Sequence, residues 1–138
     1  MRLYVDASVI LRIVVNAHNA LPEWKTLGYP TSSALLQVEC LRTLDRFQTS
    51  GELRPEEIPR SYAALHEAMS RIQLLKVDEG IVERAGGPFG LPLKTLDAIH
   101  LVTAIAWRER LGDDVTFVTH DRPLAAAALT YHFPVLGA

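Results

Sequence analysis

The chain has 138 residues, of which 49% are hydrophobic and 22% charged, a composition that fits one globular domain and argues against a disordered chain. Its single cysteine, Cys40, excludes an intramolecular disulfide and a cysteine-rich zinc site, and it suits a reducing compartment. A net charge of −2 excludes an extended basic surface, so any polyanion must be held by a local group of basic residues.

The first predicted elements are a strand and a helix. Leu3-Tyr4-Val5 is a short apolar run, which predicts a strand that ends at Asp6-Ala7-Ser8. Residues 9–15 are then apolar apart from Arg12, as expected of a buried helix. An acidic residue therefore stands between the strand and the helix.

A long helix is predicted after a loop at residues 18–30. Thr31-Ser32-Ser33 offers side-chain oxygens that suit the N-cap of a helix at residues 34–49, and Ser50-Gly51 ends this helix. The loop carries little strand pattern, so the second strand of the sheet is placed within residues 26–31.

The middle of the chain continues the alternation of helices and strands. Pro55-Glu56-Glu57 begins a helix predicted to extend to Ile72, because proline and acidic residues favour the first turn. Residues 74–77 are typical of a strand and residues 79–85 of a short helix. The Gly- and Pro-rich segment 86–92 is predicted to be a loop.

The last part of the chain contains its most apolar helix. Residues 95–111 predict a helix that is apolar on nearly every side and therefore buried. Residues 115–118 are a β-branched and aromatic strand, which Thr119-His120-Asp121 separates from a helix at residues 122–131. A short strand is predicted at residues 134–136.

Strands that alternate with helices predict an α/β fold with a mostly parallel sheet of four or five strands, covered by helices on both faces. No repeat or linker divides the chain, so we expect residues 1–138 to form a single domain. No apolar run approaches the roughly 20 residues needed to cross a bilayer, and Asp6 comes too early for a secretory signal. We therefore expect a cytoplasmic protein without a membrane partner.

Four acidic residues occupy positions that suggest a site. Asp6 and Asp121 follow predicted strands, and parallel α/β sheets bind ligands at the carboxyl ends of strands, near the point where the strand order reverses. Glu39 lies in an apolar part of its helix, and Asp97 lies in the first turn of the buried helix. Charges at such positions are costly unless they have partners.

Each acid taken alone also has a structural explanation. Asp6 and Asp121 could cap the helices that they precede, and Asp97 could interact favourably with the helix dipole. Glu39 could pair with Arg42, three residues later. Four carboxylates at one sheet edge would repel each other and lose hydration, which requires protonation, arginine pairing or a hard cation. Ligand sets made only of oxygen favour Mg²⁺ or Mn²⁺ over zinc.

The order of these acids along the chain resembles the PIN-domain family, and within it the VapC-like toxins of toxin–antitoxin pairs. The resemblance extends over essentially the whole chain. It is carried by Val5-Asp6-Ala7-Ser8, by Glu39 with Arg42, by the segment 96–104 (LDAIHLVTA) and by Thr119-His120-Asp121. It implies a three-layer α/β/α fold and a Mg²⁺- or Mn²⁺-dependent endoribonuclease.

The resemblance also implies roles for individual residues. Asp6, Asp97 and Asp121 would hold the metal ions, and Glu39 would bind a metal ion or orient the attacking water. The two hydroxyls expected near the first and last acids are those of Ser8 and Thr119. The basic residues that could contact the RNA backbone are Arg42, Arg46, Lys94 and Arg122.

The family further implies RNA as substrate, a small antitoxin protein as partner, a homodimer, and contact with DNA only through the antitoxin. The alternative within the fold is a non-toxic protein that processes RNA, or a module that only binds RNA or a partner. An aspartate-nucleophile phosphatase would have a second acid where Ser8 stands. Cys40 is expected to be a core residue and His100 a buried, hydrogen-bonded histidine, although His100 shares a helix face with Asp97.

Overall fold

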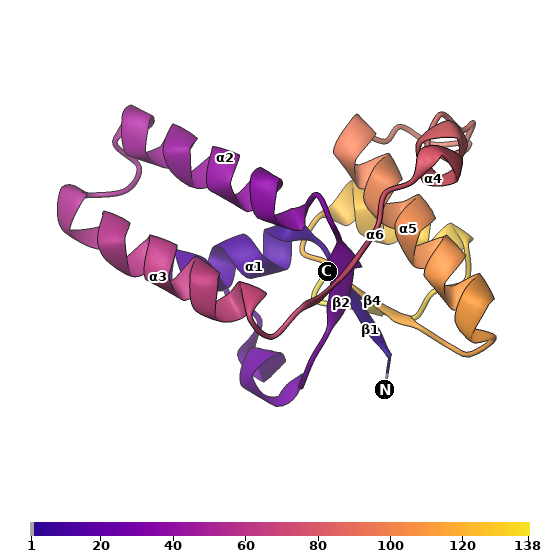
Figure 1. Cartoon of the computed structure of the whole chain (residues 1–138), viewed down its shortest axis with the longest axis horizontal. Coiled ribbons are helices and arrows are strands. Elements are labelled where there is room, and N and C mark those ends of the chain that lie inside the picture. Colours follow the sequence, from indigo (N-terminus) through magenta and orange to yellow (C-terminus); the bar gives the residue numbers. More distant parts are fainter. Residues whose placement is uncertain (1) are drawn as a thin grey trace.

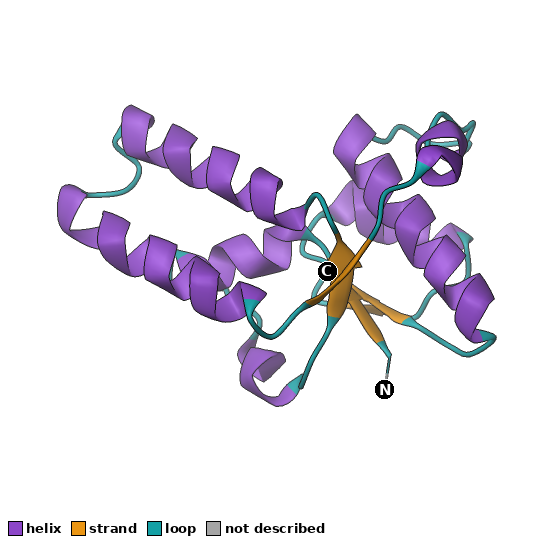
Figure 2. Ribbon diagram, viewed as in Figure 1, coloured by secondary structure: helices purple, strands orange, loops and turns teal. Residues whose placement is uncertain are grey.

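A five-stranded sheet, parallel throughout, lies at the centre of the computed structural model, which describes residues 2–138. Its strands are β1 (Leu3–Val5), β2 (Thr31–Ser33), β3 (Gln73–Leu75), β4 (Thr116–Val118) and β5 (Val135–Leu136). They are arranged in the order β3-β2-β1-β4-β5. Figure 2 shows the strands lying together between the helices. In the central register Tyr4 pairs with Thr31 on one side and with Phe117 on the other. The predicted α/β class and the number of strands are confirmed.

Helices cover both faces of this sheet (Figure 1). The helices are α1 (Ala7–Val14), α2 (Leu36–Ser50), α3 (Ile58–Met69), α4 (Glu79–Arg84), α5 (Thr95–Leu111) and α6 (Arg122–Thr130), with short 3₁₀ helices at Pro22–Thr26 and Pro55–Glu57. The helices α1, α2 and α3 pack on one face, and α5 and α6 cover the other, with α4 beside α5 (Figure 1). The expected three-layer α/β/α arrangement is therefore present.

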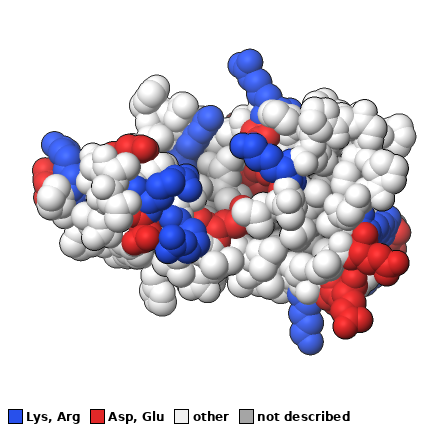
Figure 3. All heavy atoms as spheres, turned by 90° about the horizontal axis from the view of Figure 1, so that it is seen from above, with Lys and Arg blue, Asp and Glu red and all other residues white. Residues whose placement is uncertain are grey.

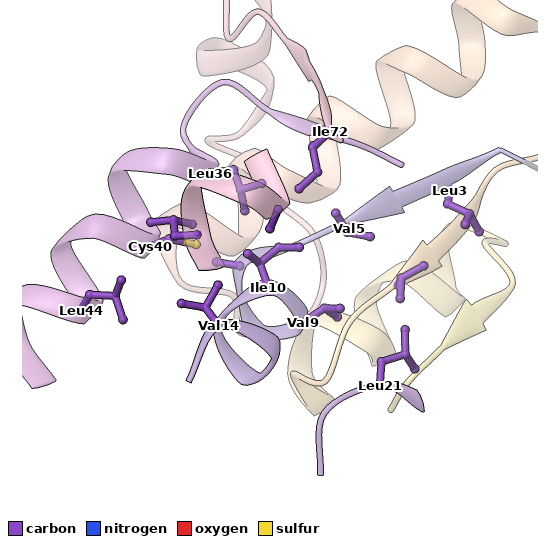
Figure 4. Packing of buried hydrophobic residues seen from close by; sticks show 14 of the residues in the cluster. Leu3, Val5, Val9, Ile10, Val14, Leu21, Leu36, Cys40, Leu44 and Ile72 are labelled. Carbon is purple, nitrogen blue, oxygen red and sulfur yellow. The ribbon is translucent and has the colours of Figure 1, made fainter. Parts of the chain in front are cut away.

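Two hydrophobic cores lie between the sheet and its two helix layers, because alternate residues of a strand point to opposite faces. Leu3 and Val5 of β1 belong to the core beneath α1, α2 and α3, whereas Tyr4 belongs to the core beneath α5 and α6. Figure 4 shows the first core, in which Cys40 and Leu44 of α2 pack over α1. Full burial of an aliphatic side chain such as Leu44 contributes about 1.5–3 kcal/mol.

The second strand is not where the sequence predicted it. β2 is formed by Thr31-Ser32-Ser33, the residues predicted to cap the following helix, and Thr26 instead ends a 3₁₀ helix. These polar side chains are buried in the sheet because each has a hydrogen-bond partner. Thr31 donates to the side chain of Gln73 at 3.2 Å, and Ser32 donates to the Val5 carbonyl at 2.6 Å. The Ser33 hydroxyl accepts from the backbone N–H of Leu35 at 2.9 Å.

Most other boundaries agree with the sequence to within a few residues. The helix predicted from Pro55 to Ile72 is divided into a 3₁₀ turn at Pro55–Glu57 and the α-helix Ile58–Met69. Gly51 ends α2 in the left-handed conformation, with φ of 79°, which glycine adopts without steric cost. Among residues 2–138, no helix is long and apolar enough to span a membrane.

Candidate active site at the carboxyl edge of the sheet

The strand order reverses between β1 and β4, because β2 and β3 extend the sheet on one side and β5 extends it on the other. Side chains that follow β1 and β4 therefore meet at the edge where α/β sheets bind ligands. Asp6 follows β1, and Asp121 comes shortly after β4, as the sequence predicted. The backbone N–H of Asp6 donates to the Val118 carbonyl at 3.3 Å, which joins the ends of the two strands.

Asp6 is almost entirely buried, with 3% of its surface exposed. The Ser8 hydroxyl donates to its Oδ1 at 2.6 Å, and the Thr119 hydroxyl donates to its Oδ2 at 2.8 Å. Burial raises the pKa of the Asp6 carboxyl, although these two hydroxyls and the nearby His100 act in the opposite direction. The two hydroxyls therefore hold both oxygens of Asp6 in a fixed orientation at the edge. Asp6 also stands at the N-cap position of α1, and the backbone N–H of Val9 in the first turn of that helix helps to lower its pKa. The firm hydrogen bonds of its two carboxylate oxygens are those to Ser8 and Thr119.

The same two hydroxyls connect the segment that carries Asp121. The backbone N–H of His120 donates to the Ser8 hydroxyl at 2.9 Å, and that of Asp121 donates to the Thr119 hydroxyl at 3.0 Å. The Oδ1 atom of Asp121 accepts from the backbone N–H of Leu124 at 2.9 Å, so Asp121 does cap α6. Asp121 therefore caps α6 through its side chain, and its backbone is held near Asp6 through the Thr119 hydroxyl.

Asp97 lies in the first turn of α5 and shares a cleft of about 400 Å³ with Asp121 and Lys94. The other residues that line this cleft are Pro92, Leu93 and Pro123. The pKa of Asp97 is raised to about 6, first by burial and then by the negative charges of Asp121, Asp6 and Glu39. The charges of the three other acids therefore act on Asp97, although only Asp121 shares its cleft.

Glu39 is held from inside the protein rather than by its own helix. Its Oε1 lies 2.5 Å from Nε2 of His100, a residue of α5. The structural alternative, in which Glu39 pairs with Arg42, is wrong, because Arg42 bonds to Asp45 at 3.1 Å. Glu39 also lines a groove of about 250 Å³ with Arg42 and Arg46. His100 is buried and hydrogen-bonded as expected, but sequence reasoning missed its link to Glu39.

The acids fit a hard divalent cation by their chemistry and only in part by their spacing. Among residues 2–138, no three or more His, Cys, Asp or Glu side chains are grouped closely enough to form a metal site by themselves. Mg²⁺, however, commonly keeps several waters and binds only one or two carboxylates together with a substrate phosphate. Asp97 and Asp121 share one cleft, and repulsion raises the pKa of Asp97, so the pair suits a cation in this way.

Basic side chains surround this acidic edge unevenly. Lys94 lines the cleft beside Asp97, while Arg42 and Arg46 line the groove beside Glu39. Arg122 is exposed at the start of α6 and lines neither hollow. Figure 3, viewed from above onto this edge, shows acidic side chains recessed between basic ones in the middle of the face. An anionic ligand could therefore reach the acids along a basic surface despite the net negative charge.

Comparisons with known proteins agree with this geometry. The model of the PIN domain family matches residues 3–133. The chain is 34% identical to Ribonuclease VapC46 of Mycobacterium tuberculosis strain H37Rv over 138 aligned residues, which cover 97% of this chain and 95% of the relative. The crystal structure of PAE2754 from Pyrobaculum aerophilum has a similar fold, with a TM-score of 0.66 and 19% identity, over 98% of this chain and 83% of that chain.

Proposed function

The chain belongs to the PIN-domain family, and on this premise we propose that it is a divalent-metal-dependent endoribonuclease and the toxin of a toxin–antitoxin pair. The observation that carries the proposal is that Asp97 and Asp121 share one cleft, while the buried Asp6 follows β1 at the edge where the strand order reverses. The relative that is named a ribonuclease supports RNA as the substrate and a VapC-like role.

The two carboxylates of the cleft, Asp97 and Asp121, would hold a Mg²⁺ or Mn²⁺ ion together with Asp6. When bound, the ion would act as a Lewis acid toward the scissile phosphate and lower the pKa of a water molecule. The protein supplies a rigid setting for it, because Ser8 and Thr119 hold both oxygens of Asp6 and tie β1 to the segment after β4. The positive ion would also offset the repulsion between the acids.

The remaining residues would position water and RNA. Glu39 would accept a hydrogen bond from the attacking water and direct its oxygen toward the phosphorus atom. Lys94, at the rim of the cleft, would bind phosphate oxygens of the strand being cut. Arg42 and Arg46 of α2 would bind the backbone of the adjoining nucleotides, because they line the groove that contains Glu39. Arg122 would contact RNA outside these two hollows.

The proposal includes the partners and the location that the VapC-like resemblance implies. We expect the protein to work in the cytoplasm, to form a homodimer, and to be inhibited by a small antitoxin whose basic segment occupies the acidic edge. DNA would be contacted only through that antitoxin. Charge complementarity supports this form of inhibition, since a basic segment can neutralise the acids in place of a metal ion.

The proposal is tested by incubating the purified protein with a mixed pool of synthetic RNAs in Mg²⁺, in Mn²⁺ and in EDTA. Wild-type protein should cleave with either metal and not in EDTA. Asp97→Asn should lose roughly 100-fold or more of this activity while keeping its circular dichroism spectrum, because even outer-shell metal contacts are worth up to that factor. Asp114→Asn, a change of an exposed acid in the loop before β4, should cleave as the wild type does.

Expression in a bacterial host separates the toxin from the alternatives. Growth should stop when the wild type is produced and continue with Asp97→Asn. Metal-dependent cleavage without growth arrest would instead identify a non-toxic RNA-processing enzyme. Binding of RNA without cleavage in any metal would identify a binding module and refute the nuclease.

A further inference from the structure

A buried chain of hydrogen bonds connects the centre of the sheet to Glu39. The hydroxyl of Tyr4, in β1, lies 2.7 Å from Nδ1 of His100, in α5, and Nε2 of His100 lies 2.5 Å from Oε1 of Glu39, in α2. Tyr4 is fully buried, and only 2% of the His100 side chain is exposed. Three elements that are distant in the sequence thus meet through a single imidazole ring.

The chemistry of the three groups determines the direction of these hydrogen bonds. A carboxylate can only accept, so Nε2 of His100 must carry the hydrogen that is donated to Glu39. In the neutral ring Nδ1 is then the acceptor, and the Tyr4 hydroxyl donates to it. Burial raises the pKa of Tyr4 well above its ordinary value, so this hydroxyl keeps its proton. In the neutral ring, the hydrogen bond to Tyr4 therefore selects the tautomer of His100 that can donate to Glu39. A protonated ring also donates from Nε2, so the contact with Glu39 exists in either form.

Tyr4 is itself fixed by the packing of the second core. Its ring stacks on Phe117 with centroids 5.3 Å apart and meets the ring of His100 edge-on at 5.8 Å. Phe117 is in turn packed edge-on against Phe133. A side chain anchored in this way loses little further freedom when it holds a partner, so the imidazole is pre-organised.

Glu39 is the end of this chain that reaches the surface. About 13% of its side chain is exposed, and it lines the groove that also contains Arg42 and Arg46. Within residues 2–138 only its Oε1 atom takes part in a hydrogen bond, so Oε2 is left for a ligand in the groove. An unbraced glutamate on a helix surface would instead sample several rotamers.

We propose that His100, anchored by Tyr4, is a positioning residue that holds the carboxylate of Glu39 in the orientation needed to direct the attacking water. This inference rests on the ribonuclease function proposed above. His100 touches neither RNA nor metal, and it acts through Glu39 alone. Supporting contacts of this kind are typically worth 10- to 100-fold in activity, so losing this contact should lower kcat by about that factor and leave KM nearly unchanged.

The contact by which His100 holds Glu39 is called the brace, and three variants test it by kinetics. His100→Leu fills the space but has no donor, and it should lower kcat about 10- to 100-fold. His100→Gln carries an amide N–H in the place of Nε2 and should recover most of that loss. Tyr4→Phe removes only the anchoring hydroxyl and should lower kcat by a smaller factor. Leu65→Ala, which leaves a cavity in the other core beneath α3, should lower Tm without lowering kcat, which controls for simple destabilisation.

The coupling between the residues is measured in a Glu39→Ala background. There, His100→Leu should have no further effect on kcat, because the carboxylate that it positions is gone. Equal losses of kcat in both backgrounds, or a His100→Gln variant as impaired as His100→Leu, would overturn the proposal.

Nitrogen-15 NMR of the imidazole tests the same contact without any enzyme assay. In wild-type protein without metal, Nε2 of His100 should be the protonated nitrogen and its proton should exchange slowly with water. Glu39→Ala should speed this exchange, and Tyr4→Phe should release the ring to a mixture of tautomers. A tautomer mixture in the wild type would refute the brace even if RNA is cleaved. Failure to cleave RNA with an intact Nε2–H signal would refute the proposed function and leave the contact standing.

Discussion

Replacing Asp97 by Asn should make the metal-free protein more stable at pH 8. The pKa of this carboxyl is about 6 in the folded protein, against an ordinary value of 3.8, because of burial and the charges of Asp121 and Asp6. The folded state therefore binds this proton more tightly than the unfolded state does. Ionised Asp97 lowers the stability above pH 6, and this penalty fades as the pH falls toward 4. Asparagine removes the charge at nearly constant volume.

The size of the effect follows from the shift. About two pH units correspond to a ceiling of about 3 kcal/mol at 1.36 kcal/mol per unit. Asp97 is only half-buried, so solvent screening reduces this to about 1–2 kcal/mol. The variant also loses a favourable interaction between this charge and the dipole of α5, which reduces the gain in stability by about 0.3–1 kcal/mol. Repulsion still wins, with a net gain of about 1 kcal/mol, or roughly 3 °C in Tm for a domain of this length.

Thermal unfolding in EDTA, followed by circular dichroism from pH 4.5 to 8, measures this difference directly. Asp97→Asn should exceed the wild type by the largest margin at pH 8 and by a much smaller one at pH 4.5, while Asp114→Asn should follow the wild type throughout. Saturating Mg²⁺ should narrow the margin at pH 8, since the ion stabilises the wild type more. A lower Tm for Asp97→Asn at pH 8, or a margin that does not change with pH, would refute the repulsion between the acids.

Two further substitutions and one chemical modification test other parts of the structure. Thr119→Val removes the hydroxyl that orients Asp6. Urea unfolding should show that the free energy of unfolding falls by about 1–3 kcal/mol, and cleavage should be reduced. An unchanged urea midpoint would contradict this role. Ser32→Ala deletes a buried donor to the Val5 carbonyl and should cost about 1 kcal/mol in the same assay without altering cleavage by the folded protein. Burial raises the pKa of Cys40 to about 12, so iodoacetamide should modify it only in denaturant, and alkylation of the native protein with loss of activity would point to a thiol mechanism instead.

The edge that carries the site could be predicted because β1 and β4, the strands that precede Asp6 and Asp121, lie in apolar runs of the sequence. Leu3-Tyr4-Val5 and the run that contains β4 are recognisable in the sequence, and every strand of a parallel sheet ends at the same edge. The residues that follow such strands, Asp6 and Asp121, could then be placed together without coordinates. The capping explanation was equally local, and the structure shows both acids at N-cap positions. Asp121 accepts from the backbone of α6, whereas both oxygens of Asp6 accept from the Ser8 and Thr119 hydroxyls.

The second strand could not be predicted, because its residues carry no strand pattern. Thr31, Ser32 and Ser33 are polar, and such residues normally favour turns and helix caps. They are buried in the sheet because their hydroxyls have partners elsewhere, such as the side chain of Gln73, 42 residues away, and the carbonyl of Val5, 27 residues away. A pattern read along the chain contains no information about those partners.

By itself the sequence determined the α/β class and the position of Asp6 and Asp121 after β1 and β4, at the carboxyl edge of the sheet. Only the tertiary structure decided how each carboxylate is held. Glu39 has a plausible partner three residues away in Arg42, yet it bonds to His100, 61 residues away, and the pKa of Asp97 depends on the charges of Asp121 and Asp6. Hydrogen bonds and charge repulsion act over a few ångströms of space, and the folded chain sets those separations independently of distance along the sequence.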